Sequence, residues 1–383
     1  MSSPLCHWRI LALLLSMAPF MAQAAPPSAC AQLAHLVDSA PSGPVFLASY
    51  PTAEPGPLAG TAFLYDNAAA AIALVGCGDR PRAERIGQAI LFALDHDRFW
   101  HDGRLRNAYV AGAAEHKPVK LSGWWDKTQN RWLEDRYQVG SDVGNMAWAM
   151  LAMLALDHND AAARIGDWVV QWQDRRGAGG FTGGLIGHEP SPESRGWKST
   201  EHNTDLTAAF TLLAERTKNP KWRDLAGTAR HFVEAMWNPA CGCFAAGTTE
   251  DGVTPNMTLS LDAQVWPLLA LPGATFDVKD ALSKRLATQG GYAYGEAKDG
   301  VWTEGTAQVA LLTGDQALHA VIERQRGPDG GYFATSAAAL PTGYGLESDP
   351  TKPRLYFRLP HLGALAWVAL ADARFDPFLL RKL

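Results

Sequence analysis

The sequence predicts an all-helical protein in which an inner ring of six helices lies inside an outer ring of six. Three observations lead to this fold class. Segments that are apolar on every side alternate along the chain with segments that are apolar on one side only. Strand-like alternation is scarce and confined to loops. Short connections alternate with long ones. Helices that are apolar all round are buried, and one-faced helices lie outside them.

The predicted buried helices share one plan: a capping or turn residue, an acid in most of them, and then an almost unbroken apolar run. The clearest start is Gly196–Phe210, where Ser199 or Thr200 can cap a helix that continues through Leu213. The buried helices span 62–77, 142–156, 201–214, 261–271, 304–313 and 361–371.

The amphipathic helices repeat an apolar stripe at helical spacing. In 162–175, residues Ile165, Trp168, Val169 and Trp172 stand at i, i+3, i+4 and i+7. Segments 221–237 and 81–95 do the same. Pairing the two kinds gives six hairpins, for which an (α/α)6 toroid is the economical packing. They are 62–95, 142–175, 201–237, 261–289, 304–326, and 361–371 with 28–40.

The loop lengths indicate which end of the ring is functional. Connections from inner to outer helices are short, such as 78–80 and 218–219, whereas those to the next inner helix are long. The long ones are 96–140, 176–199, 238–260, 290–302 and 327–358. Long loops in compact domains are usually functional. We therefore expect the cleft where the inner helices begin.

Composition narrows the function classes. The chain has 383 residues, 47% of them apolar and 19% charged, with a net charge of -5, which suits a large core and argues against nucleic acid as a partner. Residues 1–24 read as a signal peptide: His7 and Arg9, the apolar run 10–15, and Ala22-Gln23-Ala24 as a small-x-small cleavage site. The apolar run is shorter than the about 20 residues that span a bilayer. We expect cleavage after Ala24, an exported (periplasmic or secreted) single domain over 25–383, no membrane insertion and a monomer.

The cysteines fit an exported protein. Cys6 leaves with the signal peptide, and disulfides are allowable after export. Cys30 begins an outer helix and Cys77 ends an inner one, so both lie at the closed end of the ring and are predicted to pair. Cys241-Gly242-Cys243 is too short for an easy bridge, which leaves its redox state open. We see no His or Cys set beside it with the spacing of a metal site.

Candidate catalytic groups gather at the starts of the inner helices: Asp66, Asp142, Glu201, His202, Asp205, Asp262, Glu304 and His361. Any one acid in a first helical turn is explained by the helix dipole, which stabilises it by about 0.3–1 kcal/mol. The set is harder to explain, because burying that many charges without use is unfavourable. We therefore expect at least two of these acids to be catalytic.

Aromatic residues in or beside the long loops favour a sugar ligand, because flat rings stack on sugar faces. Trp125, Trp197 and Trp302 are the expected substrate contacts, and about half of the others are expected to anchor loops. The wider set is Trp100, Trp124, Trp132, Tyr137, Tyr292, Tyr294, Tyr332, Tyr344 and Tyr356. No phosphate loop, nucleophile elbow, zinc-protease motif or dinucleotide fingerprint is found, so we expect no metal and no cofactor.

The chain resembles bacterial six-hairpin glycosidase-like proteins over about residues 44–378. The resemblance is carried by 65–68 (Tyr-Asp-Asn-Ala), 140–145 (Gly-Ser-Asp-Val-Gly-Asn), 197–203 (Trp-Lys-Ser-Thr-Glu-His-Asn), 300–305 (Gly-Val-Trp-Thr-Glu-Gly) and 360–364 (Pro-His-Leu-Gly-Ala). It implies an (α/α)6 barrel that acts on a polysaccharide. Fold alone does not settle the substrate or the catalytic residues.

The resulting hypothesis is hydrolysis of a poly- or oligosaccharide by two carboxyl groups. Glu201 is the expected general acid, because Trp197 and the apolar helix can raise its pKa. Asp142 is favoured over Glu304 as the base, at the roughly 6.5–9.5 Å separation of inverting enzymes. His202 and Asp205 would orient the sugar or tune the proton, and Asp66, Asp262 and His361 would bind the sugar.

Three alternatives remain open. A polysaccharide lyase would use groups drawn from His202, His361, Tyr356, Arg358, Asn145 and Asn203, but the many acids would repel an anionic uronate. A non-catalytic periplasmic protein would bind glycan or scaffold an export machine. An isomerase of free sugars would favour a deep closed pocket over an open groove.

Overall fold

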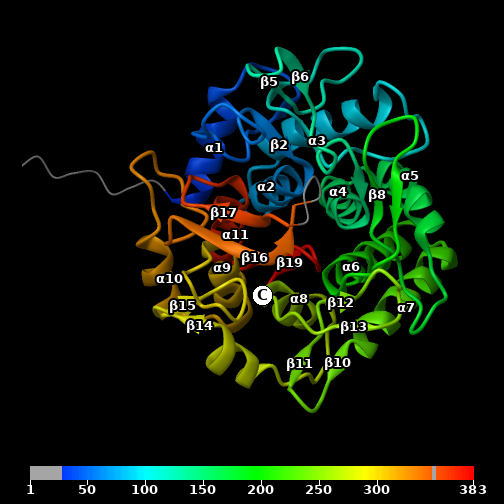
Figure 1. Ribbon diagram of the computed structural model, residues 1–383, viewed down its shortest axis with the longest axis vertical. Coiled ribbons are helices and arrows are strands. Elements are labelled where there is room, and N and C mark those ends of the chain that lie inside the picture. Colours follow the sequence, from blue (N-terminus) through cyan, green and yellow to red (C-terminus); the bar gives the residue numbers. More distant parts are fainter. Residues whose placement is uncertain (1–27, 347–350) are drawn as a thin grey trace, which may run out of the picture.

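The computed structural model describes residues 28–346 and 351–383, which form a ring of helical hairpins (Figure 1). The predicted all-α fold class is confirmed. In the described part of the chain, six inner helices surround the centre: α2 (Leu64–Gly76), α4 (Val143–Ala155), α6 (Thr200–Thr217), α8 (Leu261–Ala270), α9 (Thr303–Thr313) and α11 (Leu362–Ala373). Each packs on the next, and α11 packs on α2, so the ring closes.

The outer helices pack on the inner helices with which they were paired from the sequence. They are α1 (Ala29–Ser39), α3 (Arg80–Asp95), α5 (Asn159–Val169) continued by the 3-10 turn η1 (Val170–Trp172), α7 (Pro220–Ala235), the π-helix η2 (Ala281–Leu286) and α10 (Gln316–Glu323). The N-terminal helix α1 lies against α11, so the first and last helices complete one hairpin.

The fourth hairpin departs from the expected pattern. Its inner helix α8 ends at Ala270, and the outer element is only the short η2 rather than a full helix reaching 289. The sequence that follows α8 explains the break. Pro272 lacks a backbone N–H, and Gly273 adopts a φ of 81° that most residues avoid.

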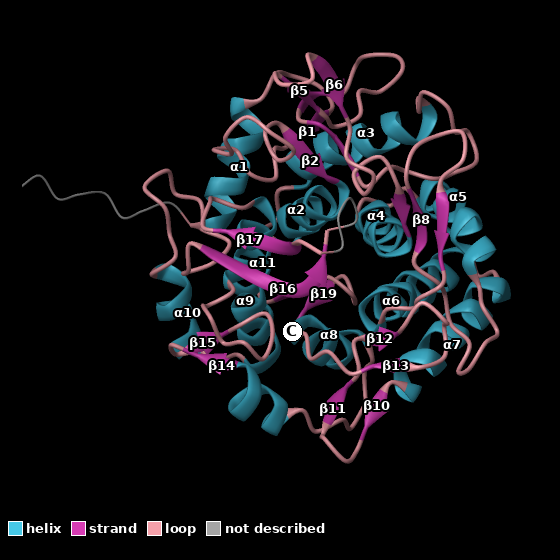
Figure 2. Cartoon of the chain, in the orientation of Figure 1, coloured by secondary structure: helices cyan, strands magenta, loops and turns pink. Residues whose placement is uncertain are grey.

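Strands are short and lie in the loops, as predicted (Figure 2). The antiparallel pairs are β1 (Val45–Phe46) with β4 (Gly112–Ala113), β2 (Thr61–Phe63) with β3 (Ala108–Val110), β5 (Trp124–Asp126) with β6 (Arg131–Leu133), β10 (Trp237–Asn238) with β11 (Cys243–Phe244), β12 (Gly247–Thr248) with β13 (Pro255–Asn256), β14 (Ala287–Thr288) with β15 (Gly291–Tyr292), β16 (Ala339–Gly345) with β17 (Pro353–Phe357), and β18 (Phe375–Asp376) with β19 (Arg381–Lys382). A three-stranded sheet joins β7 (Ser141–Asp142), β8 (Gly184–Ile186) and β9 (Glu193–Arg195).

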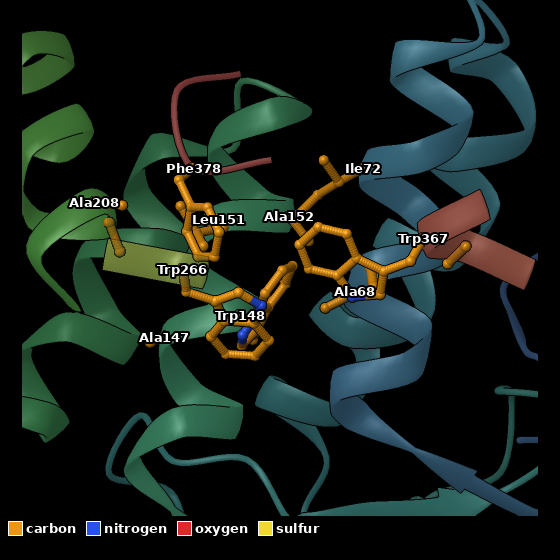
Figure 3. Packing of buried hydrophobic residues seen from close by; sticks show 14 of the residues in the cluster. Ala68, Ile72, Ala147, Trp148, Leu151, Ala152, Ala208, Trp266, Trp367 and Phe378 are labelled. Atoms are coloured by element: carbon orange, nitrogen blue, oxygen red, sulfur yellow. The ribbon is translucent and has the colours of Figure 1, made fainter. Parts of the chain in front are cut away.

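Aromatic side chains fill the interior of the ring. Trp148, Trp266 and Trp367 come from three inner helices, and Phe378 enters from the C-terminal segment (Figure 3). The rings of Trp148 and Trp266 lie 5.4 Å apart, as do those of Trp148 and Phe378. Small side chains on the inner helices leave room for these rings. The barrel is therefore a packed core rather than a pore.

Two disulfides are formed within the described residues. Cys30 bonds to Cys77, with Cα atoms 5.9 Å apart, which confirms the predicted pair. Cys241 also bonds to Cys243, whereas the sequence suggested that this spacing is too short for an easy bridge. Gly242 allows the bridge, because its φ of 58° turns the backbone so that the Cα atoms of Cys241 and Cys243 lie 5.3 Å apart.

The predicted signal peptide falls within residues 1–27, outside the described residues. Among the residues that the structure describes, none of the helices is both long and apolar enough to cross a membrane.

Candidate active site

The starts of the inner helices bring the candidate residues together, and helix capping explains part of this arrangement. Asp142 caps α4 by accepting a hydrogen bond from the N–H of Gly144 at 2.9 Å. Ser199 caps α6 at the N–H of His202. Local sequence thus determines where each helix begins. Because the inner helices form a closed ring, these starts lie around one end of the barrel.

Glu201 and Asp262 form a carboxyl pair at the starts of neighbouring helices α6 and α8. Ser260 donates a hydrogen bond to Oε1 of Glu201 at 3.1 Å. Burial, followed by the charge and hydrogen bond of Asp262, raises the pKa of Glu201 well above its usual range. Burial also raises the pKa of Asp262. The pair therefore holds a proton at pH values where exposed carboxyls have lost theirs.

Asp205 lies one turn below Glu201 on α6 and is almost fully buried. Burial raises its pKa, and the charges of Asp262 and Asp142 raise it further. Its Oδ1 finds no hydrogen-bond partner within the described chain. Asp205 is thus near enough to Asp262 and to Asp142 for their charges to act on its carboxyl.

Glu304 lies on α9 and is held by a chain of two hydrogen bonds. The indole N–H of Trp367 donates to the hydroxyl of Tyr65 at 2.7 Å, and that hydroxyl donates to Oε1 of Glu304 at 2.5 Å. Burial raises the pKa of Glu304 to about 7, against the opposing effect of His361. Glu304 is therefore a carboxyl that changes its protonation near neutral pH, in a fixed orientation.

His361 lies between two carboxyls. Its Nε2 is 3.3 Å from Oδ2 of Asp66, and its Nδ1 is 3.8 Å from Oε2 of Glu304. The N–H of Ala364 donates to Nδ1, so the neutral ring carries its proton on Nε2, toward Asp66. Burial lowers the pKa of His361, but Asp66 and Glu304 outweigh burial, and the net pKa is raised. The ring of Tyr50 stacks on this imidazole at 4.5 Å.

Asp142 and His202 form a second, more accessible cluster with Trp197. The Nε2 of His202 is 3.4 Å from Oδ1 of Asp142, and the ring of Trp197 lies 5.4 Å from that of His202. Gly144 is required at this point, because a side chain there would collide with the imidazole of His202. The side chain of His202, at the start of α6, thus contacts Asp142 at the start of α4.

Tyrosines cover the carboxyls. The hairpin β16–β17 carries Tyr344 and Tyr356, and Figure 1 draws it in front of α9 and α11. The rings of Tyr356 and Tyr294 lie 5.9 Å apart. Burial raises the pKa of Tyr344, and the charges of Glu201 and Asp262 add to the shift. The carboxyls therefore lie in a largely enclosed site in this structure, and not along the open cleft expected from the sequence.

Two tryptophans predicted to contact substrate are placed differently. Trp302 is only 1% exposed, because it packs beneath Tyr294 and Tyr356, so it supports their rings and presents no free face. Trp125 is 55% exposed on the hairpin β5–β6, which Figure 1 shows outside the inner ring. Neither therefore joins the group of side chains around Glu201 and Glu304.

Sequence reasoning missed Tyr65, Tyr50 and Ser260. Tyr65 directly precedes Asp66 at the start of a buried helix, and a polar-tipped ring in that position needs a hydrogen-bond partner, so this signal was available. Ser260 stands at the N-cap position of α8, where a serine by itself indicates only capping. Tyr50 lies in a connection whose pattern carries no such signal.

The arrangement suits proton transfer. Among the described residues, no arginine or lysine pairs with Asp66, Asp142, Glu201, Asp205, Asp262 or Glu304, a set that comes from five inner helices. Likewise, no three metal-binding side chains in the described part of the chain are placed to hold a metal ion. Carboxyls whose pKa values are raised, as those of Glu201, Asp205, Asp262 and Glu304 are, can donate and accept protons near neutral pH.

Solved structures with the same fold include carbohydrate-active enzymes. A glycosidase in complex with glucose shares 14% identity over 90% of this chain and 95% of that chain, with a TM-score of 0.57. A family 76 glycoside hydrolase from a bovine Bacteroides thetaiotaomicron strain shares 12% identity over 89% and 76%, with a TM-score of 0.55. The cellobiose 2-epimerase from Spirochaeta thermophila shares 12% over 89% and 92%, also at 0.55. No protein-family model matches the chain, and no curated protein matches its sequence. These likenesses establish the six-hairpin glycosidase-like fold.

Proposed function

We propose that this protein is a glycoside hydrolase that cleaves a glycosidic bond by carboxyl acid/base catalysis. The observation that carries the proposal is the Glu201–Asp262 carboxyl pair, whose pKa values burial raises, with a further carboxyl, Asp142, at the start of the adjacent helix. Glycoside hydrolysis needs one carboxyl that retains its proton and one that is ionised.

Glu201 is the proposed general acid. Burial and Asp262 keep its proton in place, and the bond from Ser260 fixes the carboxyl's orientation. In the transition state Glu201 would transfer this proton to the oxygen of the leaving sugar. Asp262 cannot be the opposing base, because its hydrogen-bond contact with Glu201 leaves no room for a water molecule between them.

Asp142 is the proposed base. It begins α4, which packs directly on α6, and packed helices lie about 8–10 Å apart. Inverting glycosidases hold their two carboxyls roughly 6.5–9.5 Å apart, with room for a water molecule, and retaining ones roughly 5–5.5 Å. Asp142 and Glu201 lie at the starts of two different packed helices, so we propose inversion, with a water molecule activated by Asp142. The imidazole of His202, 3.4 Å from Asp142, would orient this carboxylate.

The remaining groups are proposed to bind the sugar. Glu304, Asp66 and His361 would accept and donate hydrogen bonds to its hydroxyls, and Glu304 is the alternative base. Trp197, beside His202, would cover one sugar face. We propose a poly- or oligosaccharide as substrate, in keeping with the glucose-bound structural neighbour. We also propose export after cleavage at Ala24, and a monomer.

The proposal is tested by incubating the purified mature protein with a panel of polysaccharides and measuring new reducing ends. Release of reducing ends without new ultraviolet absorbance is expected, and proton NMR of the first product should show the inverted anomer. New absorbance from an unsaturated sugar would instead identify a lyase. Binding without any product would contradict hydrolysis and leave a glycan-binding protein.

The lyase finds little support in the site. Asn203 is one candidate to neutralise a uronate, but its side chain hydrogen-bonds to the backbone of Phe181 and Ser199. Arg358 lies over the ring of Phe333 instead of facing the carboxyls. An anionic sugar would therefore meet a site in which acids outnumber cations.

Isomerisation or epimerisation of a sugar is the second candidate, favoured by His361. An imidazole buried between Asp66 and Glu304, under the ring of Tyr50, can move a proton at a carbon beside a carbonyl. The enclosed site and the epimerase neighbour agree with this chemistry. Incubating free sugars in D₂O separates the two candidates, because an epimerase incorporates deuterium at carbon and forms no new reducing ends.

A further inference from the structure

The disulfide between Cys241 and Cys243 takes no part in the proposed hydrolysis. It joins Cys241, in the loop of the hairpin β10–β11, to Cys243, the first residue of β11, two positions away, whereas Cys30 and Cys77 are 47 positions apart. A cross-link stabilises a fold mainly by restricting the unfolded chain, and this effect grows with the length of the closed loop. The Cys241–Cys243 bridge therefore adds little stability compared with Cys30–Cys77.

The hairpin has other interactions that hold its loop. The N–H of Ala240 donates to the side chain of Asn238 at 2.9 Å, and that of Cys241 donates to the backbone carbonyl of Asn238 at 3.3 Å. Across the strands, the rings of Trp237 and Phe244 pack 5.0 Å apart. The turn is thus defined by bonds that do not involve sulfur, so the hairpin can persist when the disulfide opens.

The two sulfur atoms have different surroundings. Cys241 is partly exposed, whereas Cys243 is only 2% exposed. The guanidinium of Arg285 approaches Sγ of Cys243, with Nη1 at 3.6 Å. A neighbouring cation stabilises a thiolate, and the more stable thiolate is the better leaving group in disulfide exchange. An incoming thiol would therefore attack Cys241 and displace Cys243.

We propose that Cys241 and Cys243 form a thiol–disulfide exchange site for small thiols, independent of the glycan site. The thiolate of the incoming molecule attacks Sγ of Cys241, forming a mixed disulfide. The Cys241–Cys243 bond breaks, and its electron pair stays on Cys243 as a thiolate beside Arg285. A second thiolate then attacks the small molecule's sulfur, releasing a small-molecule disulfide and the Cys241 thiolate. Two thiols are oxidised, and one protein disulfide is reduced.

The test exposes the folded mature protein to glutathione buffers of increasing reduced-to-oxidised ratio, followed by acid quenching, alkylation and peptide mass analysis. Cys241 and Cys243 are expected to be alkylated at ratios that leave Cys30–Cys77 intact, with the intermediate glutathione adduct on Cys241. Reduction of Cys30–Cys77 at the same or a lower ratio would contradict the proposal. So would an adduct found on Cys243 instead of Cys241.

Two sets of variants test the reasons given. Arg285→Gln should slow reduction of Cys241–Cys243 several-fold, whereas Lys284→Gln, which removes an exposed neighbouring cation paired with Asp280, should leave the rate unchanged. Equal rates in both variants would contradict Cys243 as the leaving group.

A Cys241→Ser/Cys243→Ser protein should keep its helical circular dichroism and nearly its melting temperature. Its unfolding would show that the bridge is a structural cross-link.

Discussion

The hydroxyl of Tyr65 on α2 donates a hydrogen bond to Glu304 on α9, and these two helices lie on either side of α11 in the inner ring. The bond therefore joins helix starts that do not neighbour each other, and Trp367 of α11 completes the connection by donating to Tyr65. This arrangement fixes a carboxyl whose pKa lies near neutrality at the mouth of the barrel.

Replacing Tyr65 with phenylalanine tests this connection. The change removes a hydrogen bond to a carboxyl and leaves the indole N–H of Trp367 without its acceptor, so we expect a loss of about 1.5–3 kcal/mol in the free energy of unfolding. Because the Tyr65 bond lowers the pKa of Glu304, that pKa should rise in the variant. Urea unfolding at several pH values measures both. Tyr292→Phe, at a partly buried tyrosine outside this chain of bonds, is the control, and equal losses in the two variants would contradict the connection.

The raised pKa of Glu304 predicts how stability depends on pH. The folded protein holds this proton more tightly than the unfolded chain, since the pKa is about 7 against a reference value of 4.5. The stabilisation is complete below about pH 4.5 and is lost as the pH rises through about 7, by on the order of 3 kcal/mol. Glu304→Gln, which resembles the protonated acid, should flatten this decline in urea unfolding between pH 5 and pH 8. If the free energy of unfolding of Glu304→Gln declined with pH as steeply as that of the wild-type protein, Glu304 would not titrate in this range.

Asp262 and Ser260 are predicted to move the pKa of Glu201 in opposite directions. Asp262 raises this pKa and the bond from Ser260 lowers it, next to the larger effect of burial. In a plot of kcat against pH, Asp262→Asn should therefore shift the fall in rate on the basic side to lower pH, and Ser260→Ala should shift it to higher pH. Shifts of the same sign in both variants would exclude Glu201 as the group that controls this fall in rate.

Gly363 is predicted to be essential to the site because of its missing side chain. A Cβ there would lie 2.7 Å from Oδ1 of Asp66, 2.8 Å from Cε1 of His361 and 3.0 Å from Oε2 of Glu304. Gly363→Ala should displace these groups and lower kcat/KM by about 10²-fold, since small misplacements have effects of that size. Gly227→Ala is the matched control, because a Cβ on Gly227 meets nothing within 4 Å, and it should stabilise α7 by up to about 1 kcal/mol. Equal activity of the two variants would contradict the claim that Asp66, His361 and Glu304 need the room that Gly363 leaves.

The sequence was sufficient to predict the ring and the helix starts, because hydrophobic period, capping residues and loop lengths are local signals. The same reasoning placed Glu201 and Asp142 on adjacent helices, and it paired Cys30 with Cys77 from the end of the ring that each occupies. These successes share a cause: each depends only on where a helix begins or ends.

Contacts between distant loops could not be predicted in this way. Trp302 is buried because Tyr294 and Tyr356, from two different loops, close over it, and no local pattern carries that information. The Cys241–Cys243 bridge depends on the backbone conformation of Gly242, which the residue type permits without requiring it. The hydrogen bond between Tyr65 and Glu304 spans 239 residues of sequence.

The most direct test of carboxyl catalysis compares Glu201→Gln with Glu215→Gln on whichever glycan the wild-type protein cleaves. Both glutamates lie on α6, but Glu215 is exposed at the far end of the helix from the site. We predict that Glu201→Gln lowers the rate of reducing-end release by about 10²–10⁴-fold with a nearly unchanged melting temperature, while Glu215→Gln remains fully active. Reducing-end release by Glu201→Gln at the wild-type rate would contradict the proposed mechanism.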